Sequence, residues 1–210
     1  DVIAITEHDS LEVALRAREL WARRRHRFEL VTGVEVTTLQ GHLIALYLEE
    51  PVPSLRSIED TLDAVHRQGG VAFVPHPMSW LTRSIGPGTL QRIHERRDAG
   101  LWLDGIELAN ESPPARPFIA RARRLNDELL GLAGIGASDA HFVQAIGSAR
   151  TRFPGTTAAD LRTAFATKTT VCESARYPRL RDVGLMRTLS LPLTGLRATP
   201  KQLGWRRTAW

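Results

Sequence analysis

The stretch GASDAHFVQAIGSA, residues 136–149, ends a short apolar strand and places two metal-ligating side chains in the turn that follows. The apolar residues predict a strand over 132–137, and Asp139 and His141 come directly after it. A carboxylate and an imidazole two residues apart, just past a buried strand, can hold a divalent ion. The alternative is a polar turn in which Asp139 only caps the backbone.

Three other predicted strands carry similar side chains at or near their ends. His76 stands between two prolines that fix its backbone, with a satisfied core histidine as the alternative. Glu35 interrupts the apolar run LVTGVEVTT, so it should meet a metal, a cation or a structural salt bridge. His8 is the preferred ligand in its turn, and its neighbours Glu7 and Asp9 are candidate ligands or partners that orient a ligand.

His42 opens a strand directly after a glycine, and a surface turn histidine is an equal alternative. A set of His, Asp and Glu without Cys suits Zn, Mn or Fe, and carboxylate bridging suits two or more ions. Arg83 and Arg150 are candidate phosphate ligands because arginine binds phosphate in a bidentate manner. Solvated arginines are the alternative at both positions.

Strands and helices alternate along the chain, which predicts β/α units in a mainly parallel sheet or barrel. Strands are predicted at 2–6, 28–38, 42–48, 71–74, 103–109, 132–137 and 169–172. Helices are predicted at 11–25, from Ser57 to Gly69, at 90–97, at 116–130 and from Thr157 to Ala166, with a further candidate at 183–191. Ser10, Ser57 and Thr157 are the expected caps. The helix at 116–130 is amphipathic, and its expected buried face carries Phe118, Ile119, Ala122, Leu125 and Leu129. Such folds carry their reactive groups at the carboxyl ends of the strands.

Composition predicts one ordinary globular domain: 210 residues with 42% hydrophobic and 24% charged side chains. The net charge of +5 is concentrated at the end, because residues from Ser174 onward sum to +7 and residues 1–173 to −2. We expect this basic end to be solvated rather than a nucleic-acid-binding segment. The single Cys172 excludes an internal disulfide, and no membrane span or signal peptide is recognisable, which is compatible with the cytoplasm.

Six stretches, taken in order, resemble the PHP family, the polymerase and histidinol-phosphatase superfamily of metal-dependent phosphoesterases, in its stand-alone bacterial form. They are AITEHDS (4–10), GVEVTT (33–38), GHLIALYL (41–48), GGVAFVPHP (69–77), DGIELAN (104–110) and GASDAHFVQAIGSARTRFP (136–154). The resemblance implies a distorted (β/α)7 TIM-like barrel over residues 1–176, followed by the basic tail 177–210. It also implies two or three divalent ions at the carboxyl mouth of the barrel.

The resemblance also assigns roles to individual residues. The positions that match family ligands are His8, Glu35, His42, His76, Asp139 and His141. Glu35 matches the bridging carboxylate, and Glu35, Asp139 and His76 are the expected catalytic residues. Glu7 stands where Asp is more usual in the family. The family's opening strand with its His-x-His motif has no counterpart in this chain, so we expect it upstream of Asp1 and expect this chain to bind metal weakly and turn over poorly.

Three functions remain open from the sequence. The first is a phosphoesterase in which a metal-bound hydroxide attacks a small phosphorylated substrate. The second is hydrolysis of an amide or carbamate at the same centre, because the same ligands serve both reactions. The third is a metal-stabilised module that binds without catalysis and docks its Arg-rich tail on an acidic partner. No membrane partner is expected.

Overall fold

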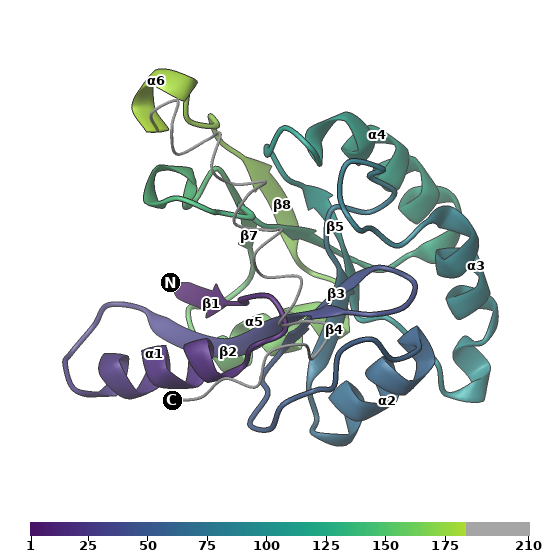
Figure 1. The fold of residues 1–210 in the computed structure, drawn as a ribbon, viewed down its shortest axis with the longest axis horizontal. Helices are drawn as coiled ribbons and strands as arrows, with labels where there is room; N and C mark the ends of the chain where they lie inside the picture. Colours follow the sequence, from purple (N-terminus) through teal and green to yellow (C-terminus); the bar gives the residue numbers. More distant parts are fainter. Residues whose placement is uncertain (184–210) are drawn as a thin grey trace.

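The chain forms a six-stranded sheet that curls into half a barrel (Figure 1), in a computed structural model that describes residues 1–183. The strands are β1 Val2–Ile5, β2 Glu29–Thr37, β3 His42–Leu46, β4 Val71–Val74, β5 Gly105–Ala109 and β6 Ala133–Gly136. Their order in the sheet follows the sequence. β2–β3 and β3–β4 pair antiparallel, and the other three pairs are parallel, so the sheet is mixed.

Helices cover the convex face of this sheet, as the view in Figure 1 shows for α2, α3 and α4 on its right-hand side. The helices are α1 Glu12–Ala22, α2 Ile58–Arg67, α3 Pro87–Glu95, α4 Arg116–Leu125, α5 Ala158–Thr167 and α6 Leu180–Val183. Ser57 and Thr157 cap α2 and α5 through their hydroxyls, as predicted. The predicted cap at Ser10 is wrong, because α1 follows Leu11 and has no side-chain cap.

One apolar cluster lies on each face of the sheet, because successive side chains of a strand point to opposite sides. The outer cluster joins Val34 and Val36 of β2 to side chains of the covering helices, including Leu62 and Leu90. The inner cluster joins alternate strand residues to α5: Val31, Ile44, Leu46, Val71, Phe73, Ala133 and Ile135 pack with Leu161 and Phe165. Helix α5 therefore fills one end of the concave face with apolar side chains.

The helix predicted at 116–130 changes its winding before it ends. It is α-helical to Leu125 and then makes a wider π-helical turn, Asn126–Leu130. The wider turn shifts the buried face by one residue, so Leu130 is 3% exposed whereas Leu129, predicted to be buried, is 40% exposed. The predicted register of the last turn was therefore wrong.

A second sheet of two strands was only half predicted. β8, Val171–Ser174, corresponds to the strand expected at 169–172, but its antiparallel partner β7, Ala149–Arg152, was not foreseen. The sequence ARTR of β7 has no apolar alternation, so nothing in it favoured a strand.

The end of the chain is described only in part. Residues 184–210, which hold most of the basic tail and nearly all of the candidate helix 183–191, lie outside the described residues. Within residues 1–183, none of the helices combines the length and the apolar character needed to cross a membrane.

Candidate metal centre

The candidate centre is built around Glu35, which lies at the polar end of the concave face. Glu35 is two positions from Gly33 and four from Val31 on β2, so it shares the face of the inner apolar cluster. His42 reaches the same face from β3, in step with Ile44. Because α5 fills only the other end of this face, the carboxylate meets imidazoles rather than apolar side chains.

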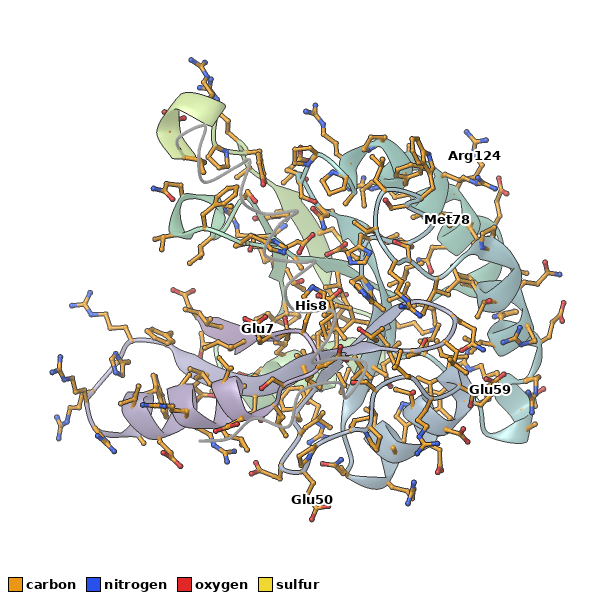
Figure 2. All side chains as sticks on the ribbon, viewed as in Figure 1. Glu7, His8, Glu50, Glu59, Met78 and Arg124 are labelled. Atoms are coloured by element: carbon orange, nitrogen blue, oxygen red, sulfur yellow. The ribbon has the colours of Figure 1, made fainter. Side chains whose placement is uncertain are left out.

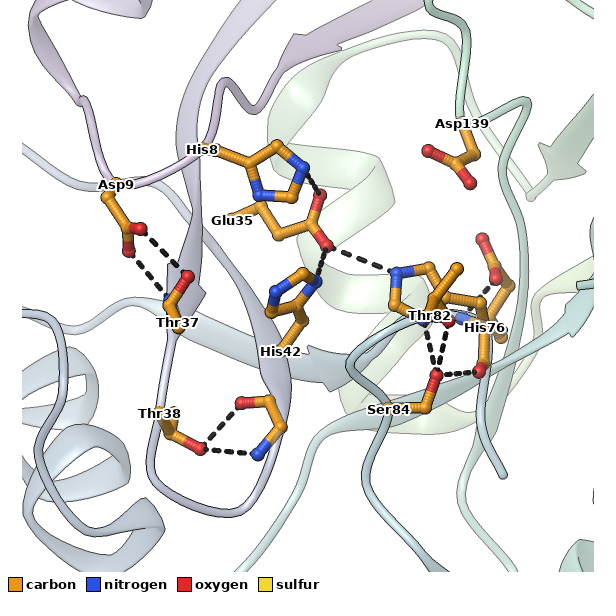
Figure 3. Close-up of polar contacts among 12 residues, drawn as sticks. His8, Asp9, Glu35, Thr37, Thr38, His42, His76, Thr82, Ser84 and Asp139 are labelled. Atoms are coloured by element: carbon orange, nitrogen blue, oxygen red, sulfur yellow. Dashed lines mark hydrogen bonds and ion pairs between the residues drawn. The ribbon is translucent and has the colours of Figure 1, made fainter. Parts of the chain in front are cut away.

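Three imidazole nitrogens surround the Glu35 carboxylate, as Figure 3 shows. His42 Nδ1 lies 2.7 Å and His76 Nε2 3.1 Å from Oε1, whereas His8 Nε2 lies 3.6 Å from Oε2. The rings of His8 and His42 meet edge to face with centroids 4.9 Å apart. The centre thus has two sides, one at each oxygen of Glu35.

The backbone brings His8 to this carboxylate although 27 positions separate them in the chain. His8 forms an isolated parallel bridge with Glu35, in which the Glu35 N–H donates to the Glu7 carbonyl and the Asp9 N–H donates to the Glu35 carbonyl. The turn after β1 therefore continues the pairing with β2 for one more residue. In Figure 2, His8 lies near the middle of the molecule, whereas Glu50 and Glu59 point outward at its rim.

Opposing effects act on the charges of this cluster. Burial alone would raise the pKa of Glu35, which is 6% exposed, but its contacts with His42 and His76 and the nearby His8 hold the pKa far below its usual range. Burial would lower the pKa of His76, but the hydrogen bond and charge of Glu35 raise it. A buried carboxylate kept ionised among imidazoles is therefore a site that attracts positive charge.

Two unpaired nitrogens test whether the residues fit a metal ion. His8 Nδ1 and His42 Nδ1 are buried and have no hydrogen-bond partner among the described residues. His42 Nδ1 approaches Glu35 closely, but without the alignment of a hydrogen bond. His8, Glu35 and His42 each offer a ligand atom, and these atoms all lie within 4.8 Å of one another. Histidine and carboxylate ligands at this separation fit a divalent ion such as zinc.

Asp139 and His141 form a separate pair beyond β6. His141 Nδ1 lies 3.0 Å from the Asp139 carbonyl oxygen and 3.7 Å from its Oδ1, and the His141 side chain is half exposed. Figure 3 shows the Asp139 carboxylate facing the side where Glu35 and His76 lie, but within residues 1–183 it forms no hydrogen bond or ion pair with them. The charge of Asp139 nevertheless contributes to the raised pKa of His76. The pair therefore stands close to the Glu35 cluster without being part of it.

Asp9 and Glu7 do not face the cluster. Both oxygens of Asp9 accept hydrogen bonds, from the Thr37 N–H (2.7 Å), the Thr37 hydroxyl (2.8 Å) and the Ser54 hydroxyl (2.6 Å). Asp9 thus anchors the turn that carries His8. Glu7 is exposed, and among the described residues its side chain accepts only from the N–H of His8, 3.2 Å away.

The two candidate phosphate-binding arginines differ in their surroundings. Arg150 on β7 is bound through Nε and Nη2 to Glu173 on β8, at 2.9 Å in each case. Both nitrogens contact the same oxygen, Oε2, so this ion pair gives Arg150 a structural role in the β7–β8 hairpin. Arg83 is exposed and has no ion-pair partner within residues 1–183, and its carbonyl oxygen accepts from the His42 N–H.

Glu107 on β5 is a buried acid that sequence analysis missed. It is 1% exposed, accepts from the His76 N–H and the Asn110 side chain, and burial raises its pKa to about 8. Asn110 in turn accepts from the Ser112 N–H, and the Ser112 hydroxyl donates to Asp139 at 3.4 Å. The signal was available, since Glu107 interrupts the apolar run GIELA just as Glu35 interrupts its own strand.

Comparison with known proteins gives one family and two curated relatives. The family model described as PHP-associated matches residues 120–170. The uncharacterized protein MJ1587 of Methanocaldococcus jannaschii is 34% identical over 110 residues, which is 52% of this chain and 58% of that protein. The uncharacterized protein MJ0417 of the same organism is 28% identical over 131 residues, 59% of this chain and 51% of that protein. The chain thus spans little more than half the length of these relatives.

A solved structure shares the fold. It is the crystal structure of a two-domain protein from Bacteroides vulgatus ATCC 8482, described as containing a predicted PHP-like metal-dependent phosphoesterase. The TM-score is 0.63, and the match covers 83% of this chain and 56% of that one. The sequence identity is 20%, so the likeness bears on the fold.

Proposed function

We propose, from the premise that this chain belongs to the PHP superfamily, that it is a metal-dependent phosphoesterase whose centre is built on Glu35. The observation that carries the proposal is the buried Glu35 carboxylate with three imidazole nitrogens around it, together with the buried Nδ1 of His8, which has no hydrogen-bond partner within residues 1–183. Buried polar atoms are nearly always paired, so an unpaired imidazole nitrogen beside this carboxylate favours a metal ligand.

In this proposal His8, Glu35 and His42 would hold one divalent ion, since their ligand atoms all lie within 4.8 Å of one another. His76, whose Nε2 also lies beside Glu35, would help to hold a second ion. Asp139 and His141 would complete the coordination from the far side. Bound ions of this kind supply Lewis acidity and lower the pKa of a water ligand, which suits attack on phosphorus. The proposed metal is zinc, manganese or iron. The proposed fold of the whole domain is the distorted (β/α)7 TIM-like barrel that the resemblance implies.

Arg83 is a candidate cation for the substrate at this end of the sheet. Arg83 lies in the loop after His76, beside His42, and is not neutralised by a carboxylate within residues 1–183. We assign it to the phosphate of a small phosphorylated substrate, which arginine binds in a bidentate manner. Arg150 is the second candidate for this role, although its Nε and Nη2 already contact Glu173 Oε2.

The test is a substrate panel assayed with the 210-residue chain. Phosphate monoesters, diesters and amides are offered with Mn²⁺ or Zn²⁺, and hydrolysis is compared with Glu35→Gln and with Glu59→Gln on the outer helix α2 as the matched control. We expect slow metal-dependent phosphate release from this chain, reduced by at least about 100-fold in Glu35→Gln and unchanged in the control. If the chain cleaved amides but no phosphate esters, the result would support the amide or carbamate reaction instead. If the chain bound metal but hydrolysed none of the substrates, the result would support the metal-stabilised binding module.

A further inference from the structure

His76 has four polar atoms, its backbone N and O and its ring Nδ1 and Nε2, and the first three form hydrogen bonds away from the candidate metal centre. Its N–H donates to Glu107, and its carbonyl oxygen accepts from the Ser84 hydroxyl at 2.7 Å. Its Nδ1 lies 2.8 Å from the same Ser84 oxygen and 3.1 Å from the Thr82 hydroxyl. Only Nε2 faces the centre, 3.1 Å from Glu35. His76 is therefore fixed at its backbone and at one side of its ring.

The single proton of Ser84 decides which ring nitrogen of His76 is protonated. A serine hydroxyl has one proton to donate and two lone pairs that accept. Because Ser84 gives its proton to the His76 carbonyl, it can only accept from Nδ1 and from the Thr82 hydroxyl, 2.7 Å away. Nδ1 must therefore carry a proton. In the neutral ring, the lone pair then lies on Nε2 and points at the carboxylate of Glu35.

We infer that Ser84, supported by Thr82, is a positioning residue that fixes the Nδ1–H tautomer of His76 and so aims the Nε2 lone pair at the ion beside Glu35. In this tautomer Nε2 and the Glu35 oxygen, 3.1 Å apart, would both be available as ligands to a bound divalent ion. The inference rests on the proposed metal centre and adds the side chains that prepare one of its ligands.

The backbone around Ser84 is shaped to bring its hydroxyl to this place. The neighbouring Arg83 carbonyl accepts from the His42 N–H at 2.8 Å, and the Met78 N–H donates to the Ile85 carbonyl at 3.1 Å. Gly41 packs against the chain at this point, since a Cβ there would lie 2.6 Å from the Ser84 carbonyl carbon. These contacts hold the loop that carries Ser84 against the two segments that carry His42 and His76.

The experiment compares three serine variants of the full 210-residue chain. Ser84→Ala removes the acceptor, Ser84→Thr retains the hydroxyl, and Ser79→Ala is the matched control. Ser79 lies in the same loop, is buried and donates to the Pro114 carbonyl, so its loss tests the loop without touching the ring of His76. Zinc affinity is measured by competition with a chromophoric chelator, without any substrate. Two-bond ¹H–¹⁵N spectra report the protonated nitrogen of His76 with and without zinc.

The expected result is a wild-type His76 with a slowly exchanging Nδ1 proton and a zinc affinity that falls about 10-fold in Ser84→Ala. Adding Thr82→Val to Ser84→Ala should bring the loss to about 100-fold, whereas Ser84→Thr should restore affinity and Ser79→Ala should retain it. The inference is overturned if Ser84→Ala keeps both the Nδ1 proton and the affinity, or if Ser79→Ala loses as much.

The same measurements distinguish a failure of the positioning role of Ser84 from a failure of the proposed metal centre. If the wild-type chain binds no zinc, the metal centre is wrong, and the metal-free spectra alone decide the role of Ser84. A protected Nδ1 proton of His76 that disappears in Ser84→Ala then supports the positioning role. Its absence from the wild-type spectrum overturns that role.

Discussion

Replacing Asp9 should destabilise the fold without removing a metal ligand. The carboxylate of Asp9 accepts three hydrogen bonds, two from Thr37 at the end of β2 and one from Ser54 in the following loop. These bonds tie the turn that carries His8 to the strand that carries Glu35. Asp9 also has φ of 52°, a left-handed conformation that Asp and Asn tolerate better than most residues.

The magnitude follows from these contacts. A hydrogen bond to a charged group contributes about 1.5–3 kcal/mol, but three bonds to one half-buried carboxylate do not add. Asp9→Ala also leaves the N–H of Thr37, a residue only 1% exposed, without its acceptor, and it places alanine at a positive φ. We expect the free energy of unfolding to fall by about 2–4 kcal/mol. Asp9→Asn keeps an acceptor and tolerates the backbone, so its loss should be about half as large.

Urea unfolding of the metal-free chain at neutral pH measures this change, and zinc binding counts the ions per chain. Asp63→Ala is the control, because the Asp63 side chain is 66% exposed and, within residues 1–183, pairs only with Arg67 on the same helix. The free energy of unfolding of this control should change by less than about 0.5 kcal/mol. We expect Asp9→Ala to keep the wild-type number of ions. The reasoning is refuted if Asp9→Ala retains wild-type stability, or if it binds one ion fewer at unchanged stability, since Asp9 would then be a ligand.

Three further predictions test the fold around the centre. Leu130→Ala should lower the free energy of unfolding by about 3 kcal/mol and Leu129→Ala by under about 1, because the π-helical turn buries Leu130; equal losses in urea unfolding would contradict that turn. Gly136→Ala should cost about 2 kcal/mol in the same assay, since its Cβ would lie 2.2 Å from the Arg150 carbonyl oxygen; wild-type stability would show that β7 does not approach β6. Burial raises the pKa of Tyr47 to about 12, so the neutral phenol stabilises the fold below pH 10 and this contribution is lost as the pH rises toward 12. Between pH 10 and pH 12 the free energy of unfolding of the wild type should therefore fall by about 1 kcal/mol more than that of Tyr47→Phe, a figure that allows for the partial exposure of Tyr47. Urea unfolding across this pH range measures the difference, and an equal pH dependence of the two proteins would contradict the raised pKa of Tyr47.

The sequence predicted the elements whose signals are local. The strand at Val71–Val74 was placed with its observed bounds, and the hydroxyls of Ser57 and Thr157 cap the helices they were expected to cap. Apolar runs and capping residues act over a few positions, so a linear reading suffices for them. The π-helical turn was missed because its widening depends on what the last turn packs against.

The environment of single side chains was harder to predict. The ring of His66 stacks on Trp102 with ring centroids 4.1 Å apart, and its Nε2 lies 3.0 Å from Asp104. Its neighbours in sequence are charged, which suggested exposure, and its partners lie more than 35 positions away. Arg150 likewise found Glu173 only because β7 pairs with β8. Such contacts depend on strand pairing and not on the local pattern.

By itself, the sequence determined the chemical identity of the candidate centre: a carboxylate inside an apolar strand, and histidines at the ends of others. The cost of burying Glu35 without a partner already required a positive charge beside it. Only the tertiary structure decided which side chains meet that carboxylate. The curl of the sheet and the pairing of β2 with its neighbours bring His8, His42 and His76 to Glu35, and they leave Asp139 nearby but out of contact. Distances between residues tens of positions apart are set by strand register and packing, which a linear pattern does not contain.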